Sequence, residues 1–336
     1  MAKNKKIAKR SKFKMYTRFS SMIEKGLANK RAMVPDDIRS YKGWDAIKLM
    51  YSMSDEANTP INALIIAAES RWETTGMNAL FLRQVDVDAL MNGKYTINKL
   101  PKLLTPFPSF TLCLPSEFEV RGIKPGGVLV STYPDMDTFA ESSRQAYRNI
   151  GINDCHMGSP QQQGDNILTL TYMDKDGAHN VMSYLGEQLE AVMKARSYKE
   201  FKGLVTDFKD KSRLDSDLSD AEKELHYVLL KIIVSLSVYA MAREDAIVDG
   251  FPKVKGFALD KTLEHGVKSS SLTASFKKRA SPQDVYRTWF IRQLSHEKYY
   301  QGEYANWQPN SRFVFVEDTL VNSSASPKSL NLQKER

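Results

Sequence analysis

The sequence predicts an α+β protein, and three observations lead to this fold class. Apolar residues recur at helical spacing through the first hundred positions, and short β-prone runs broken by proline and glycine begin near residue 105. A long apolar stretch, 226–241, is typical of a buried helix. We therefore expect a helical N-terminal region, a mainly antiparallel sheet packed on a long buried helix, and a small C-terminal β module.

Length and composition set the limits of this interpretation. A chain of 336 residues with 42% hydrophobic residues can bury a substantial core. We divide it into a basic arm with an amphipathic helix, a helical region, an α+β core, a basic connector, an aromatic and basic C-terminal β module and a disordered tail. The boundaries of these six parts are 1–31, 32–104, 105–252, 253–283, 284–322 and 323–336.

The positive charge is concentrated in the N-terminal arm. Residues 1–31 hold 11 Lys or Arg and one acid, Glu24, which leaves 48 − 11 = 37 bases and 40 − 1 = 39 acids in the rest. Such an arm can bind RNA or DNA through the phosphates, although a solubilising terminus has the same composition. The candidate phosphate contacts are Lys5, Lys6, Lys9, Arg10, Lys12 and Lys14.

Helices are predicted for the N-terminal third. Five apolar residues at helical spacing predict that the second half of the arm is an amphipathic helix. A second helix is expected around 41–53, and a third follows Thr59 as N-cap and Pro60 in the first turn. The five residues in the arm are Met15, Phe19, Met22, Ile23 and Leu27.

Strands are predicted from residue 105 onward. Proline-flanked 110–114, the alternating run "EFEVRG" at 117–122 and the apolar run 126–133 each have β character. After a helix near 138–151, two further runs flank the turn "DKDG", which predicts a β-hairpin. Together these runs predict a mostly antiparallel sheet.

The long apolar helix has a clear start. Ser219 followed by Glu222 is a capping box, and we expect the helix to continue to "DGFPK" at 249–253. Its interrupting Lys and Ser residues indicate a buried helix and no membrane span. The Ser-rich, basic segment 253–283 has little periodicity and predicts an extended connector, in which "KKR" at 277–279 is a solvated charge run or a phosphate contact.

The C-terminal module interleaves aromatic and basic residues. Two alternating runs, 287–293 and 313–317, predict strands joined by a loop around 302–309. Such a mixture serves base stacking, cation–π contacts or a groove for an extended peptide, whereas simple packing of a small sheet explains about half of the residues. The candidate binding residues are Arg292, His296, Tyr299, Tyr300, Trp307 and Arg312.

The run "FIRQLSHEKYYQG" followed by "SRFVFVEDTLVN" resembles a family of phage and plasmid proteins related to the type V-A anti-CRISPR protein that blocks production of its target nuclease. The residues that match are Arg292, Tyr299, Tyr300, Gln301, Gly302, Val321 and Asn322. "PSFTLCLPSEFEV" and "LLKIIVSLSVYAMAREDAIVDGFP" are similar to further parts of the family pattern. The resemblance implies recognition of a nascent N-terminal peptide and loss of its mRNA. The C-terminal turn holds a single histidine, His296, where the family has several, so a role for a histidine cluster is not implied.

Catalytic signatures are missing from the sequence. No HExxH, GxSxG, P-loop or GxGxxG motif occurs, the five histidines are scattered, and two cysteines are too few for a disulfide framework or a cysteine zinc site. A metal-dependent nuclease would need Asp135, Asp137, Asp174 and Asp176 to come together. We expect a non-catalytic protein without a cofactor, catalytic residue or metal site.

The predicted function is that of a phage or mobile-element protein in the bacterial host cytoplasm. It would bind a host protein, a nascent polypeptide or a ribosome-linked complex, and so block production of a host defence protein such as a CRISPR nuclease. The alternative is an RNA- or DNA-binding virion or replication-associated protein that uses the basic arm. A third hypothesis is an endoribonuclease that depends on a metal or on His296.

Overall fold

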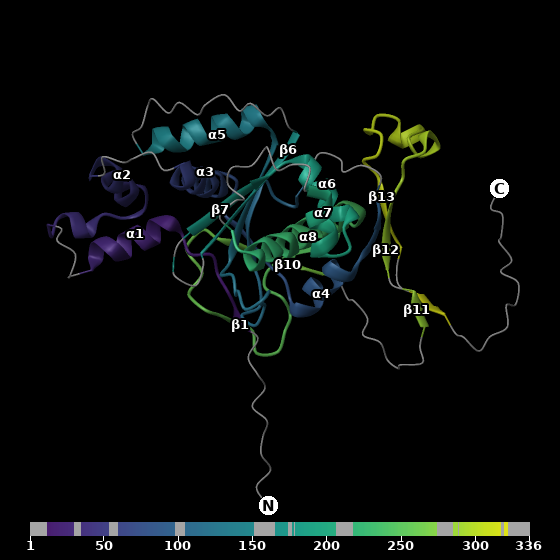
Figure 1. Ribbon diagram of the computed structural model, residues 1–336, viewed down its shortest axis with the longest axis horizontal. Helices are drawn as coiled ribbons and strands as arrows, with labels where there is room; N and C mark the ends of the chain where they lie inside the picture. Colours follow the sequence, from purple (N-terminus) through teal and green to yellow (C-terminus); the bar gives the residue numbers. More distant parts are fainter. Residues whose placement is uncertain are drawn as a thin grey trace, which may run out of the picture.

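A computed structural model gives the fold of this chain (Figure 1). The structure describes residues 12–29, 35–53, 60–97, 105–150, 165–173, 177, 179–205, 218–273, 285–287, 289–316 and 319–321. Within these residues the predicted α+β class is confirmed, with helices on a large mixed sheet and a smaller sheet near the C-terminus.

A seven-stranded sheet forms the centre of the molecule. Its order is β7-β6-β5-β4-β2-β10-β8, and β2 runs parallel to both of its neighbours while the other pairs are antiparallel. In the same order, the strands are His179–Tyr184, Asp165–Met173, Val128–Asp135, Ser109–Cys113, Asn78–Phe81, Lys268–Leu272 and Ile247–Asp249. The predicted antiparallel sheet from residue 105 is confirmed for β4 to β7, including the hairpin of β6 and β7.

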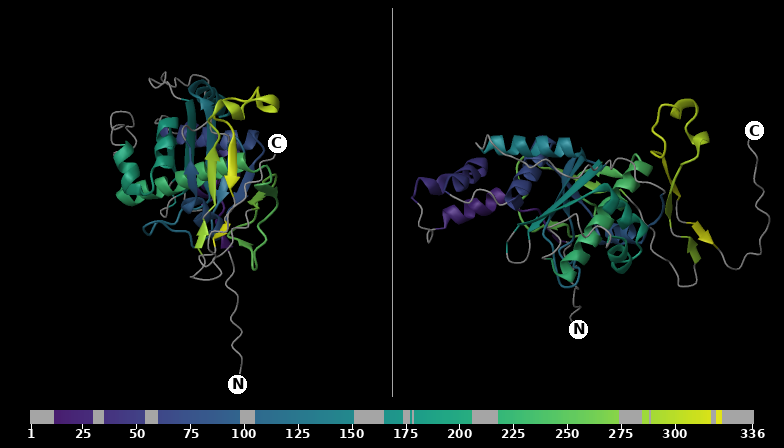
Figure 2. Two further views of the ribbon diagram at one scale, coloured as in Figure 1. Left: turned by 90° about the vertical axis from the view of Figure 1, so that its right-hand side faces the viewer. Right: turned by 45° about the horizontal axis from the view of Figure 1, so that its top comes forward.

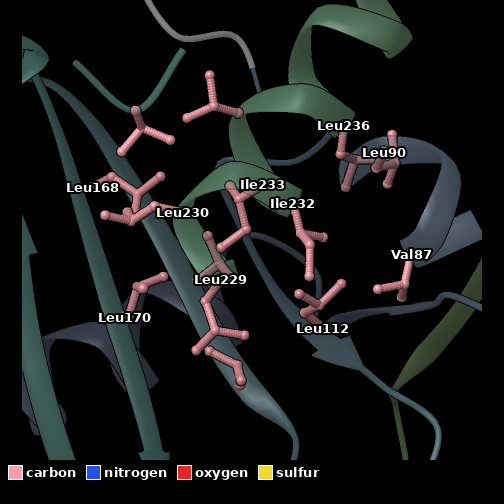
Figure 3. Packing of buried hydrophobic residues seen from close by; sticks show 14 of the residues in the cluster. Val87, Leu90, Leu112, Leu168, Leu170, Leu229, Leu230, Ile232, Ile233 and Leu236 are labelled. Carbon is pink, nitrogen blue, oxygen red and sulfur yellow. The ribbon is translucent and has the colours of Figure 1, made fainter. Parts of the chain in front are cut away.

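One face of this sheet is covered by the predicted long helix, α8 (Asp220–Ala242). The Ser219 hydroxyl accepts the N–H of Glu222 at 3.3 Å, and the Glu222 carboxylate accepts the N–H of Ser219 at 2.8 Å, which confirms the capping box. Figure 3 shows Leu230 of α8 against Leu168 of β6, within the largest hydrophobic cluster. Three shorter helices flank α8, namely α4 (Gln84–Asn92), α6 (Gly186–Lys194) and α7 (Tyr198–Val205).

The opposite face of the sheet is covered by α3 (Pro60–Thr74) and α5 (Met136–Asn149). Helices α1 (Phe19–Ala28) and α2 (Gly43–Met53) share a hydrophobic cluster with them and lie toward one end of the molecule, with the short helix η1 (Ile38–Ser40) between them in the chain (Figure 2). The helices predicted in the N-terminal third are confirmed by α1, α2 and α3, and the helix predicted near 138–151 is confirmed by α5. Thr59, the predicted N-cap of α3, lies outside the described residues.

Of the helices in the described ranges, α8 alone has the length and hydropathy of a membrane span. Its most apolar window is 78% buried within the protein.

The segment 12–18, which we call the strap, is extended and not helical. Strand β1 (Lys12–Phe13) pairs in parallel with β9 (Ala258–Leu259), and Phe13, Met15 and Tyr16 are buried. The prediction of a helix that includes Met15 was therefore wrong, because α1 begins only at Phe19. In so short a run, the alternation of apolar residues in a strand cannot be distinguished from the periodicity of a helix. The distinction is also lost because consecutive residues of this segment are buried.

A buried carboxyl group fastens the strap to α3. One oxygen of Glu69 accepts the Tyr16 hydroxyl at 2.8 Å and the Phe19 N–H at 2.6 Å, and its side chain is 2% exposed. Arg18 pairs with Glu73 on α3 and with Glu264 at 2.7 Å. These contacts make the strap part of the core.

The stability of the protein is expected to fall between pH 4.5 and pH 7 because of Glu69. Burial raises the pKa of Glu69 to about 7, although the donors Phe19 and Tyr16 and the charge of Arg18 oppose the rise. In the unfolded chain the carboxyl ionises near 4.5, so its stabilisation is complete below that pH and is lost as the pH rises through 7. The change corresponds to about 3 kcal/mol at most.

The control for this prediction is Glu69→Gln, which keeps an oxygen for both donors and cannot ionise. Urea unfolding at a series of pH values should show the fall for the natural chain and a flatter profile for the variant. Identical profiles would contradict the assignment of this pH dependence to Glu69.

Three sequence predictions are corrected by the fold. Helix α8 ends at Ala242 and not at 249–253, because Arg243 is extended and β8 joins the sheet. "EFEVRG" forms a turn and no strand, with positive φ at Arg121 and Gly122. Segment 253–283 is not simply a connector, because its residues 268–272 form β10 between β2 and β8.

The C-terminal sheet is joined to the body by a strand from the N-terminal third. Its order is β13-β12-β3, with β3 (Lys94–Thr96) parallel to β12 (Phe290–Gln293) and β13 (Phe313–Val316) antiparallel to it. A separate two-stranded sheet is formed by β11 (Val285–Arg287) and β14 (Thr319–Val321), which pair antiparallel. The helical region thus also supplies β2 and β3, which the sequence interpretation did not predict.

Candidate binding surface on the C-terminal hairpin

The candidate site lies on the hairpin formed by β12 and β13. Residues 294–312, which we call the tip loop, join the two strands and contain the short helices η3 (Glu297–Tyr299) and η4 (Gly302–Tyr304). Figures 1 and 2 show the hairpin at one end of the molecule, with the tip loop projecting beyond the helices.

The hairpin is anchored by aromatic packing on its inner face. Trp289 is 6% exposed, and its ring centroid lies 5.9 Å from that of Tyr95, 6.0 Å from that of Tyr239 and 5.6 Å from that of Phe315. These partners come from β3, α8 and β13, so one side chain joins three elements. The part of the prediction that assigns some of the aromatic residues to simple packing is confirmed for Trp289.

Two of the candidate binding residues brace the tip loop. The Tyr300 hydroxyl donates to the Leu294 carbonyl at 2.6 Å and accepts the Arg312 N–H at 3.3 Å. The Arg312 guanidinium donates to the Tyr299 carbonyl and lies 3.4 Å from the centroid of the Tyr304 ring. Tyr300 and Arg312 thus hold the two ends of the loop together, which limits what they can offer to a partner.

Three other candidates face the solvent. Trp307 is 52% exposed, with its ring edge-to-face with Tyr304 at 5.6 Å, and Arg292 and His296 are exposed. Nδ1 of His296 accepts the Lys298 N–H at 3.2 Å and caps η3. A binding partner would therefore contact the other ring nitrogen, Nε2. The half-buried Tyr299 lies beside His296, with ring centroids 6.5 Å apart.

An exposed tryptophan on a braced loop is a suitable anchor for a polypeptide. Its large apolar ring is held by neighbours and loses little conformational freedom on binding. Tyr304, the ring that supports both Arg312 and Trp307, was missed in the sequence interpretation, although it lies within the same aromatic run.

The candidate phosphate contacts of the basic arm are only partly placed. Lys12 is exposed on β1, whereas the Lys14 ammonium lies 4.0 Å from a carboxylate oxygen of Asp260. Lys5, Lys6, Lys9 and Arg10 lie outside the described residues, as do "KKR" at 277–279 and Asn322. The structure brings none of the described arm residues to the C-terminal hairpin.

Two buried ionisable groups elsewhere, His226 and Lys231, have hydrogen-bond partners within the protein. Nε2 of His226 lies 2.7 Å from the Tyr172 hydroxyl and Nδ1 lies 2.6 Å from that of Tyr184, within the core under α8. Burial lowers the pKa of Lys231 to about 8, and its ammonium donates to the carbonyls of Val192 and Ala195 at 3.1 Å each, at the end of α6. Both groups are therefore hydrogen-bonded where they lie.

The described part of the chain contains no candidate metal site. No group of three His, Cys, Asp or Glu residues there could hold a metal ion. Asp135 caps α5 by accepting the Thr138 N–H at 2.7 Å, and Asp174 and Asp176 lie outside the described residues.

The comparisons with known proteins do not extend this description. No family model, curated protein or solved structure matches the chain.

Proposed function

We propose that this chain is a non-catalytic polypeptide-binding protein of a phage or mobile element. Its C-terminal hairpin would recognise a nascent polypeptide or ribosome-linked complex in the bacterial cytoplasm, and so block production of a host defence protein. The observation that carries the proposal is the exposed Trp307 on a tip loop that Tyr300 and Arg312 hold in place. The resemblance of the same segment to the anti-CRISPR-related family agrees with it.

The expected effect of Trp307→Ala is a loss of partner binding by roughly tenfold or more, because an exposed aromatic anchor contributes about 2 kcal/mol or more. The tagged protein would be pulled down from translating bacterial lysate, with and without puromycin, and the bound RNA and peptides would be sequenced. One enriched mRNA should be lost on puromycin treatment and also on substitution of Trp307.

The matched control is Tyr41→Ala, since Tyr41 is 42% exposed and precedes α2, away from the hairpin. Tyr300→Phe is a second comparison, because it removes one hydroxyl from the brace and keeps the ring. Capture that is unaffected by Trp307→Ala and by puromycin would contradict the proposal.

The second candidate function is nucleic-acid binding by the basic arm, which the charge of residues 1–31 favours. Removal of the whole arm would not test it, because Phe13, Tyr16 and Phe19 belong to the core. Deletion of residues 1–11 removes Lys5, Lys6, Lys9 and Arg10 and spares the strap. Broad RNA affinity that falls steeply with salt and is lost in this truncation would support the alternative.

A further inference from the structure

Among the described residues, the edge of the C-terminal sheet formed by β13 carries backbone groups that have no strand partner. The Leu294 N–H donates to the Arg312 carbonyl at 2.9 Å, and the register continues through the pairs Arg292↔Val314 and Phe290↔Val316. In an antiparallel pair, alternate residues direct their backbone groups toward and away from the neighbour. Phe313 and Phe315 therefore direct their N–H and carbonyl groups away from β12.

The described residues supply no strand for these four groups. Strand β13 is the terminal strand in the order β13-β12-β3, and β12 is its only partner among the described strands. Two donors and two acceptors at such an edge form a template for another extended chain.

The outer face of this sheet combines basic and apolar side chains. Arg292 lies between Thr96 and Val314 in the register, and Phe290 lies between Lys94 and Val316. Val314 is 40% exposed, and neither Lys94 nor Arg292 has an ion pair with a described residue. The two charged residues on this face are thus both cations.

The inner face of β13 is apolar. Phe313 is 8% exposed, and the half-buried Phe315 ring lies 5.3 Å from that of Tyr239 on α8. A chain added beside β13 would place alternate side chains over the outer and the inner face. Acidic side chains would suit the outer face, near Val314 and within reach of Arg292, and apolar ones would suit the inner face.

We propose that the free edge of β13 binds an extended polypeptide in which acidic and apolar residues alternate. The backbone of the added strand hydrogen-bonds to Phe313 and Phe315, and its acidic residues are attracted by the cations of the outer face. This inference deepens the proposed function, on which it rests, by giving the recognised chain a conformation and a charge pattern.

A second copy of this chain fits the edge less well. Pairing of two β13 strands would place the Arg292 and Lys94 side chains of both copies on continuous faces that hold no described acidic residue. The Arg292 side chains of the two copies would be three strand spacings apart, about 14 Å, so their repulsion is weak, but neither cation would gain a counter-charge, as it would beside an acidic strand. Charge complementarity therefore favours the acidic polypeptide.

The test uses the full chain and fluorescein-labelled ten-residue peptides in which Val alternates with Glu or with Lys. The Val–Glu peptide should bind at least tenfold more tightly than the Val–Lys peptide. Arg292→Glu combined with Lys94→Glu should reverse that preference, whereas Lys199→Glu, an exposed change on α7, should leave it unchanged.

Backbone pairing is tested by N-methylation of every second residue of the Val–Glu peptide. Methylation of one set should reduce binding at least tenfold, and methylation of the other set should not, because only one set directs its N–H groups at β13. Loss on methylating the Val residues would indicate an antiparallel strand, and loss on methylating the Glu residues a parallel one.

Two outcomes would overturn the inference. Equal binding of both methylated peptides would exclude edge pairing, and a dimer in sedimentation that the Val–Glu peptide dissociates would assign the edge to a second copy. Neither outcome depends on the lysate experiment. If Trp307→Ala abolishes capture while both methylated peptides bind alike, the proposed function stands and the edge inference fails.

Discussion

Gly127→Ala should lower the free energy of unfolding by about 3 kcal/mol or more, which is at the upper end for a single substitution. A Cβ atom at residue 127 would lie 2.1 Å from the backbone nitrogen of Tyr16 and 2.5 Å from the carbonyl carbon of Met15. Both contacts are with backbone, so no side-chain rotation can relieve them. The strap would have to leave the first residues of β5.

The strap cannot move away without losing other contacts. The Lys14 N–H donates to the Leu114 carbonyl at 3.0 Å, and the Met15 N–H donates to Asp260 at 3.0 Å. Lys261 donates to the Tyr16 carbonyl at 2.6 Å. Displacement of the strap would break these hydrogen bonds, so that their donors and acceptors would have to bond to water, and it would expose the buried side chains of the strap.

The neighbouring glycine provides a matched control. A Cβ atom at Gly126 would have the Met173 carbonyl oxygen at 3.9 Å as its nearest neighbour, an ordinary contact. Gly126→Ala is expected to change stability by less than about 1 kcal/mol, since alanine also restricts the unfolded chain. Urea unfolding of both variants measures the difference, and equal stabilities would contradict the packing of the strap on β5.

Trp289→Ala is the second large effect, with an expected loss of about 3–5 kcal/mol. Trp289 contacts rings on β3, α8 and β13, so its removal leaves a cavity where the hairpin joins the body. The stability lost should be accompanied by faster proteolysis within the tip loop, because the hairpin is then held less firmly.

Trp307→Ala is the natural comparison, because it makes the same chemical change at a residue that is 52% exposed. We expect this variant to keep its stability within about 0.5 kcal/mol and to lose partner binding. The two tryptophans thus separate folding from recognition. Equal destabilisation by both substitutions in thermal unfolding would show that this division is wrong.

Elements whose signals are local could be predicted from the amino-acid sequence. The capping box at Ser219 and Glu222 located the start of α8, because its donors and acceptors lie within one turn. The two runs on either side of "DKDG" predicted β6 and β7, since a hairpin signal needs only a turn sequence and two flanking strands. The candidate hairpin near the C-terminus was found in the same way.

The parallel strands, the strap and the roles of residues within the tip loop depend on tertiary contacts. The β10 residues Ser269, Ser270 and Ser271 have little β signal, and their strand forms because β2 and β8 lie on either side of it. Met15 is extended because the strap fits against Gly127, far along the chain. Tyr300 and Trp307 are both aromatic residues of the same loop and cannot be distinguished by sequence pattern. The Tyr300 hydroxyl hydrogen-bonds two backbone groups across the loop, whereas the Trp307 ring faces solvent. The physical reason is the same in each case, because the energy that decides comes from partners remote in sequence, which no local pattern contains.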